Sequence, residues 1–151
     1  MKTFACVVPQ AVYDEVVVKG KARLHGDAEA IEAVLRESNN AAVMTQPRHE
    51  ELETGLGAGE RGILDLLPTE QDCVVVSDDR RFLTVLKNRG VRFLTPADVL
   101  VVMRRRAVLN QPEASQALDR LRPWIRAAAY WEARQDLEPR DDLERGEESD
   151  G

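Results

Sequence analysis

The stretch that decides the fold is Cys73-Val74-Val75-Val76-Ser77-Asp78-Asp79, an apolar run that ends in two acids. Its continuous β-branched core predicts a strand that is buried on both faces, as in a parallel sheet. The run Gly55-Leu56-Gly57-Ala58-Gly59-Glu60 precedes it and opens a helical pattern over residues 60–67. In open α/β sheets, ligands bind in the crevice outside the carboxyl ends of the strands. Helix, strand and acid in this order therefore predict carboxylates that gather at one edge of a parallel sheet.

Strand and helix patterns alternate along the rest of the chain. Strands are predicted at residues 4–8, 42–45, 73–77 and 91–94. Helices are predicted at residues 10–18, 28–36, 60–67, 79–88, 97–108, 113–121 and 124–134, with a helical turn at 49–54. This alternation predicts an α/β fold with a mostly parallel sheet.

Length and composition predict one domain over residues 1–135, followed by a disordered acidic tail over residues 136–151. The tail holds eight acids against two arginines. Cys6 and Cys73 lie in apolar runs and are expected to be buried thiols rather than a disulfide. Because the chain shows no signal peptide and no apolar stretch long enough to span a bilayer, a cytoplasmic protein is expected.

Charge divides the chain into an acidic and a basic part. Residues 80–126 carry eleven Arg and Lys against three acids, a net of +8, whereas residues 1–79 carry a net of −8. An acidic part that holds cations and a basic part that holds phosphates are what a metal-dependent nuclease needs. The alternative is that these charges are ordinary solvated helix faces.

The acids themselves have two interpretations. The glycine run before Glu60 is neither a Walker loop nor a dinucleotide-binding turn, and Glu60 could simply favour the dipole of the helix that it begins. Asp78 and Asp79 could cap a helix, and Glu15 alone would be a surface residue. A cap carboxylate can also face a ligand, however. Carboxylates gathered without a Cys or His set suit Mg²⁺ or Mn²⁺.

The run Val7-Val8-Pro9-Gln10-Ala11-Val12-Tyr13-Asp14-Glu15-Val16 resembles the second-strand-to-helix segment of PIN-domain proteins, in a subgroup related to toxin–antitoxin ribonucleases of the VapC type. Gly57-Ala58-Gly59-Glu60, with Ser77-Asp78-Asp79-Arg80-Arg81 further along, resembles the later half of its site. Val91-Arg92-Phe93-Leu94-Thr95 and the helix through Arg104-Arg105-Arg106 resemble the next segment of that subgroup. The resemblance covers roughly residues 4–122.

The resemblance implies a three-layer α/β/α sandwich and a Mg²⁺- or Mn²⁺-dependent endoribonuclease. By position, Glu15 matches the second acid of the family site, Glu60 the third and Asp79 the fourth. Asp78 could substitute for its neighbour, and Asp14 is a weaker candidate. RNA would be the substrate, with its backbone held by basic side chains: Arg80, Arg81, Arg104, Arg105 and Arg106.

One departure from the family pattern bears on activity. The chain starts at what resembles the second strand, so the first strand and the Asp at its end are expected to be missing. Either the chain is truncated at its N-terminus or it is a degenerate member that no longer cuts RNA. We therefore expect weak or absent activity.

Two functions remain open. The first is a metal-dependent endoribonuclease of the toxin–antitoxin kind, whether active or inactive. The second is a non-catalytic PIN-fold protein that binds RNA or an antitoxin-like protein, and a homodimer is also open. A response-regulator-like domain ranks lower, because neither its first-strand acid pair nor a matching downstream lysine is found.

Overall fold

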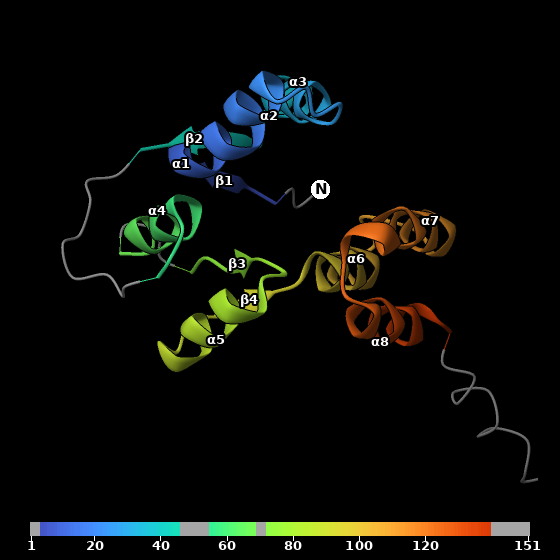
Figure 1. Cartoon of the computed structure of the whole chain (residues 1–151). Coiled ribbons are helices and arrows are strands. Elements are labelled where there is room, and N and C mark those ends of the chain that lie inside the picture. Colours follow the sequence, from blue (N-terminus) through green and yellow to red (C-terminus); the bar gives the residue numbers. More distant parts are fainter. Residues whose placement is uncertain (1–3, 46–54, 69–71, 140–151) are drawn as a thin grey trace, which may run out of the picture. The chain divides into compact units, whose positions relative to one another are not determined.

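The computed structural model describes residues 4–45, 55–68 and 72–139 (Figure 1). The chain divides into two compact units, residues 1–73 and 74–151, and each is described by itself. Both units contain parallel strands joined by helices, which confirms the predicted α/β class. None of the described helices is long and apolar enough to cross a membrane. The helical turn predicted at residues 49–54 lies outside the described residues.

The first unit is a βαβ arrangement with one further helix. Strands β1 (Cys6–Pro9) and β2 (Ala41–Met44) run parallel, with Cys6 opposite Ala41 and Pro9 opposite Met44. The connection and the added helix comprise α1 (Gln10–Tyr13), the π-helical turn η1 (Asp14–Val18), α2 (Lys19–Ala22), α3 (Ala28–Glu37) and α4 (Ala58–Leu66). Pro9 ends β1 and begins the helical run, because its fixed φ suits the first turn of a helix.

Small residues allow the helices of this connection to pack closely. Gly20 in α2 is buried, and a Cβ at that position would lie 2.9 Å from the Cβ of Ala28 in α3. Lys21 pairs with Glu32 of α3, and this hydrogen bond holds the pKa of Glu32 below its ordinary value. The side chain of Val17 fills the interior beside these contacts. Close packing therefore holds α2 against α3, and the Lys21–Glu32 ion pair adds a contact at the surface.

The second unit begins with two short parallel strands. In β3 (Val75–Val76) and β4 (Phe93–Leu94), Val75 lies opposite Phe93 and Val76 opposite Leu94. The helical elements of this unit are α5 (Arg80–Asn88), α6 (Pro96–Arg105), α7 (Gln111–Leu121), the 3₁₀ turn η2 (Arg122–Trp124) and α8 (Ala127–Leu137). Phe82 and Leu86 supply the buried face of α5.

Helices α6, α7 and α8 form a cluster with its own apolar core. The buried members are Ala97, Val101, Ala114, Leu118, Tyr130, Ala133 and Leu137. Two of the helices begin with reciprocal capping boxes: Thr95 with Asp98 at α6, and Asn110 with Glu113 at α7. These boxes satisfy backbone N–H groups that a helix start would otherwise leave unpaired.

Several predicted boundaries change in the structure. Helix α8 starts at Ala127 rather than at 124, because Pro123 and Trp124 form the 3₁₀ turn η2. The same helix continues through Leu137, three residues beyond its predicted end at 134. The helix includes Leu137 because the side chain of this residue packs in the core formed by α6, α7 and α8. Residues 140–151 of the predicted tail lie outside the described residues.

The expectation that the strand over residues 73–77 is buried on both faces is wrong. Val75 is 6% exposed, whereas Val74 is 42% and Val76 is 49% exposed. The alternation follows from a strand that is covered on one face only. Cys6 is also exposed rather than buried, and Cys73 is half-buried. Within the described residues each sheet has two strands, and a missing first strand stays a prediction.

The three-helix cluster should depend on Leu118. Replacing this fully buried side chain with Ala should lower the free energy of unfolding by about 2–5 kcal/mol, because it removes packing and leaves a cavity. Both tryptophans of the chain lie in this unit, so their fluorescence during urea denaturation reports on it. Gln116→Ala, on the exposed side of the same helix, is the control. Equal midpoints for the two variants would contradict the assigned core.

Candidate functional site

Glu15 lies on a π-helical turn rather than on a regular α-helix. The sequence predicted an α-helix over residues 10–18, but hydrogen bonding widens to the π pattern over Asp14–Val18. The run Val16-Val17-Val18 gives a physical reason, because β-branched side chains crowd a regular helix. Single π turns inside helices are frequent at functional sites. Glu15 is exposed at this turn, directly after the carboxyl end of β1 and the short helix α1.

The carboxylate of Glu15 lies on the backbone of Gly59, in the first turn of α4. A Cβ built at Gly59 would be 2.9 Å from Glu15 Oε2 and 3.3 Å from Val12 Cγ2. A second close approach occurs one turn later, where a Cβ at Gly62 would lie 3.1 Å from Pro9 Cβ. The glycines after residue 57 therefore let α4 pack against the start of the α1–η1 segment and leave room for an acid.

Glu60 lies next to Gly59 and has a structural bond of its own. The Gly57 N–H donates to Glu60 Oε2 at an N–O distance of 2.8 Å. This contact supports the start of α4, where the helix dipole favours negative charge. Because Gly57 has no side chain, it cannot return the second bond of a full capping box. The first turn of α4 thus brings together two predicted site residues, Glu15 and Glu60.

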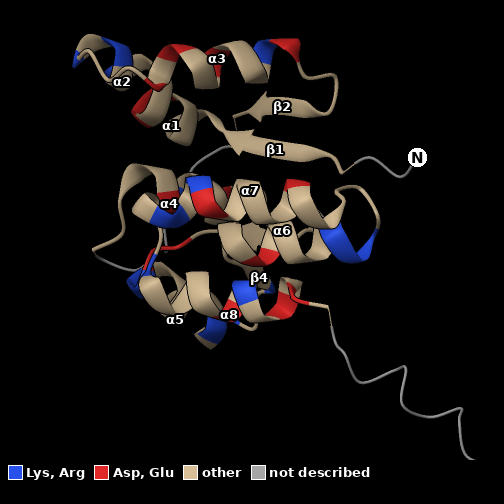
Figure 2. Cartoon of the chain, turned by 90° about the vertical axis from the view of Figure 1, so that its right-hand side faces the viewer, with Lys and Arg blue, Asp and Glu red and all other residues tan. Residues whose placement is uncertain are grey.

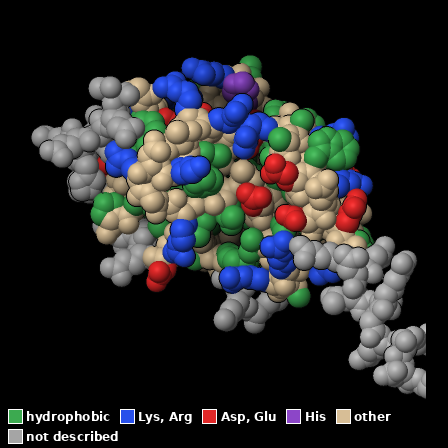
Figure 3. All heavy atoms as spheres, turned by 90° about the horizontal axis from the view of Figure 1, so that it is seen from below, with side chains coloured by type: hydrophobic (Ala, Val, Ile, Leu, Met, Phe, Trp, Pro, Cys, Tyr) green, Lys and Arg blue, Asp and Glu red, His purple; other side chains and the backbone are tan. Residues whose placement is uncertain are grey.

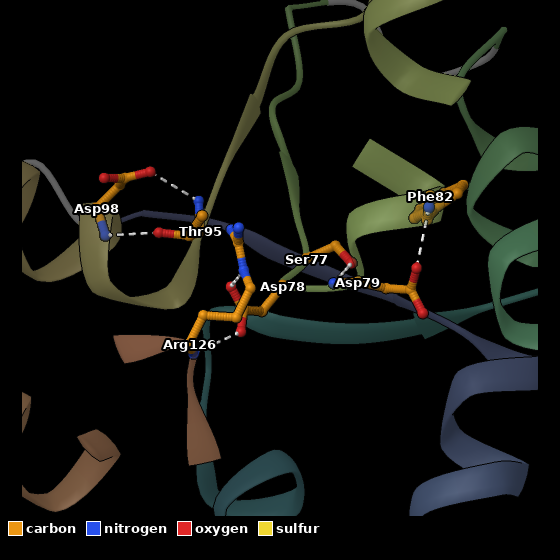
Figure 4. Close-up of polar contacts among 7 residues, drawn as sticks. All are labelled: Ser77, Asp78, Asp79, Phe82, Thr95, Asp98 and Arg126. Atoms are coloured by element: carbon orange, nitrogen blue, oxygen red, sulfur yellow. Dashed lines mark hydrogen bonds and ion pairs between the residues drawn. The ribbon is translucent and has the colours of Figure 1, made fainter. Parts of the chain in front are cut away.

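Asp79 caps helix α5 in the second unit (Figure 4). Its Oδ1 accepts a hydrogen bond from the Phe82 N–H at 3.0 Å. The Asp79 N–H in turn donates to Ser77 Oγ at 3.2 Å. The cap does not use Asp79 Oδ2, and the residue is exposed. The capping and ligand interpretations of Asp79 are therefore compatible, as expected from the sequence.

Asp78 points away from Asp79 and pairs with Arg126 (Figure 4). Its Oδ1 accepts from Arg126 Nε at 3.2 Å, and its Oδ2 accepts from the Arg126 backbone N–H at 3.3 Å. Arg126 stands just before α8, so this contact ties the end of β3 to the start of α8 across 48 positions of sequence. Both oxygens of the carboxylate thus have partners within the protein. The geometry favours a structural role for Asp78 over the metal-ligand role that the sequence predicted.

The predicted convergence of all the site acids stays a prediction. Glu15 and Glu60 belong to the first unit, and Asp78 and Asp79 belong to the second. Over the described ranges, no three Asp, Glu, His or Cys side chains form a group that could hold a metal ion. The chemistry of the donors still fits Mg²⁺, which proteins commonly bind through one or two carboxylates together with substrate phosphates.

Two groups of predicted RNA-binding arginines differ in their surroundings. Arg80 and Arg81 occupy the first turn of α5 and are exposed. The arginine run at residues 104–106 lies where α6 ends, visible as the blue end of that helix in Figure 2. There Arg104 donates to Gln111 Oε1 at 3.2 Å, and Arg105 lies 3.9 Å from Asp136. The face drawn in Figure 3 presents basic side chains at its surface.

Two features of the site could not be read from the sequence. The Asp78–Arg126 pair joins residues that are far apart in the chain, so no local pattern announces it. The close approach of the Glu15 carboxylate to Gly59 also depends on tertiary packing. The glycine spacing was the available signal, because a buried glycine inside a helix usually has a packing reason.

A double-mutant cycle should detect the contact between Glu15 and Gly59. An alanine in a helix is favoured over glycine by up to about 1 kcal/mol, but the methyl of Gly59→Ala would collide with the Glu15 carboxylate. Gly59→Ala alone should therefore give little or no stabilisation, and in a Glu15→Ala background it should stabilise the fold. Urea denaturation of the four proteins measures the coupling. Additive effects would show that the two residues do not touch.

The family model DUF3368, described as a PIN domain, matches residues 2–138 of the chain. No curated protein and no solved structure matches the chain. The matched range includes the candidate acids Glu15, Glu60, Asp78 and Asp79 and both groups of arginines. PIN domains are generally nucleases that use divalent metal ions. The chain therefore belongs to the DUF3368 family of PIN domains.

Proposed function

We propose that this protein is a divalent-metal-dependent ribonuclease of the PIN type, in which Glu15, Glu60 and Asp79 are the ligands of Mg²⁺ or Mn²⁺. One observation carries the proposal. The carboxylate of Glu15, which comes from the segment after β1, approaches Gly59 in the first turn of α4, and Glu60 is the next residue in the chain. Two acids brought to one helix start are suited to a divalent cation, which commonly takes one or two carboxylate ligands.

The cation would lower the pKa of a bound water and neutralise charge on the scissile phosphate. The protein's own residues would fix the ligand oxygens. The bond from Gly57 N–H orients the carboxylate of Glu60, and the backbone of Gly59 limits where Glu15 can lie. The bond to Phe82 N–H orients Asp79 and leaves its Oδ2 for a ligand. Such preorganisation reduces the cost of assembling a charged site.

Arginines would hold the RNA backbone. Arg80 and Arg81 directly follow Asp79 in the chain, so phosphates held by them would lie near that carboxylate. The run Arg104–Arg106 would add contacts, although Arg104 and Arg105 already have partners within the protein. A toxin–antitoxin role, with an antitoxin-like protein as inhibitor, is part of the proposal through the PIN subgroup that the sequence resembles.

One observation favours a second function, that of a non-catalytic PIN-fold protein that binds RNA or an antitoxin-like partner. Both carboxylate oxygens of Asp78 already accept hydrogen bonds from Arg126. Such a protein would keep the fold and the RNA-binding arginines without turnover. The two functions make opposite predictions for metal-dependent cleavage.

Glu60→Gln and Asp79→Asn each remove the charge of a proposed metal ligand but keep the hydrogen bond at the helix start. They keep it because an amide oxygen can still accept the backbone N–H. Both variants should remain folded. Each should lower Mg²⁺- or Mn²⁺-dependent cleavage of single-stranded RNA by about 100-fold or more, which corresponds to about 2.7 kcal/mol in the barrier. The assay is cleavage of a fluorescent oligonucleotide with metal and with excess EDTA.

Glu113→Gln is the matched control, since Glu113 accepts the equivalent bond from Asn110 N–H at the start of α7. It should leave cleavage unchanged. Cleavage that persists in EDTA would refute the metal-dependent proposal. A folded wild-type protein that binds RNA but never cleaves it would establish the non-catalytic alternative.

A further inference from the structure

The two tryptophans of this chain are both exposed, and they lie seven positions apart in the second unit. Trp124 in η2 is 79% exposed, and Trp131 in α8 is 53% exposed. Tryptophan is usually mostly buried, so two exposed rings in one short segment indicate a surface that contacts something. The proposed ribonuclease site makes no use of either ring.

A guanidinium group lies over this aromatic surface. Arg122 Cζ is 4.9 Å from the ring centroid of Tyr130 and 5.5 Å from that of Trp131. The rings of Tyr130 and Trp131 meet edge to face, with centroids 5.0 Å apart. Within the described part of the chain, Arg122 forms no ion pair, and its side chain is exposed.

The Trp131 ring contacts a buried tyrosine, Tyr130. Tyr130 is 3% exposed, and its hydroxyl donates to Asp119 Oδ1 at 2.7 Å. Arg134 Nη1 donates to the same oxygen at 3.0 Å, which joins α7 to α8. Because Tyr130 is anchored in the core of the three-helix cluster, the Trp131 ring that contacts it loses little freedom when a ligand binds.

Local charge indicates which ligand fits. Of the four arginines in residues 120–134, Arg126 and Arg134 pair with acids, whereas Arg120 and Arg122 are exposed and form no ion pair within the described part of the chain. Flat aromatic faces with nearby arginines suit single-stranded nucleic acid, since bases stack on the rings and phosphates meet the guanidinium groups. Exposed Trp and Arg are also typical of protein interfaces. The unpaired positive charge favours the polyanion.

We propose that Trp124 and Trp131 stack the bases of single-stranded RNA, with Arg120 and Arg122 on the adjoining phosphates. The proposal rests on the proposed function in that RNA is the substrate class. It assigns a base-stacking surface, the Trp124–Trp131 surface, that is separate from the metal-binding acids. Stacking reads no sequence, so this surface would select single strands over duplexes rather than one base over another.

The test uses the full chain, and its intrinsic fluorescence is the probe, because Trp124 and Trp131 are the two tryptophans in the sequence. A single-stranded uridine 12-mer is titrated in excess EDTA, so that binding is measured without metal-dependent cleavage. Saturable quenching is expected. A 12-base-pair duplex, whose bases are already stacked, should quench little.

Variants of Trp124 separate stacking from general apolar contact. Trp124→Leu should weaken binding by about 5- to 100-fold, and Trp124→Phe should restore most of the affinity. Arg122→Gln should lower the slope of log K against log salt by about 0.7, as expected for one phosphate contact on a single strand. Arg36→Gln, which removes an exposed arginine from α3 in the first unit, should change the slope less. Circular dichroism checks that each variant is folded.

RNA binding that causes no quenching, or that Trp124→Leu leaves unchanged, would overturn the proposal. So would a Trp124→Leu variant that loses self-association in sedimentation but keeps its RNA affinity, since the rings would then serve a protein interface. Failure of the Trp124–Trp131 surface leaves the cleavage results with Glu60→Gln and Asp79→Asn intact. Conversely, absent cleavage does not affect a binding assay run in EDTA.

Discussion

The close packing of α4 against the end of β1 and α1 is the constraint on which the first unit depends. A Cβ at Gly59 would lie 3.3 Å from Val12 Cγ2, and a Cβ at Gly62 would lie 3.1 Å from Pro9 Cβ. The exposed carboxylate of Glu15 also lies where a Cβ at position 59 would be. The lack of a side chain at these glycines lets the segment after β1 and the start of α4 meet. It places one acid on a helix start that already holds another, Glu60. The same helix start therefore supports the packing of the first unit and carries two of the candidate acids.

The acids of this chain show how a structural role and a functional role can share one carboxylate. Glu60 and Asp79 each use an oxygen to accept a backbone N–H at a helix start. These bonds fix the side chain and leave it capable of binding a cation. Asp78 differs, because both of its oxygens face Arg126. The two adjacent aspartates thus have different roles: Asp79 caps α5, and Asp78 binds Arg126 at the start of α8.

Local patterns predicted much of the fold. The α/β class and the parallel pairing followed from apolar runs that alternate with helical periodicity, and the PIN family followed from the order of short motifs. What local sequence could not provide was the effect of tertiary contacts. The π turn at Glu15, the one-sided burial of Val75 and the 3₁₀ turn at Trp124 depend on what packs against each segment. The same holds for Asp78, whose partner lies 48 positions away.

The central claim is that Glu15 and Glu60, together with Asp79, bind a divalent cation, and a Mn²⁺ titration of variants at the two glutamates tests it most directly. Electron paramagnetic resonance of free Mn²⁺ would give the affinity of the full chain and of Glu15→Gln, Glu60→Gln and Glu113→Gln. We predict that the first two variants bind Mn²⁺ more weakly by about 10-fold or more, and that Glu113→Gln binds like the wild type. Equal affinity in all four proteins would contradict the claim.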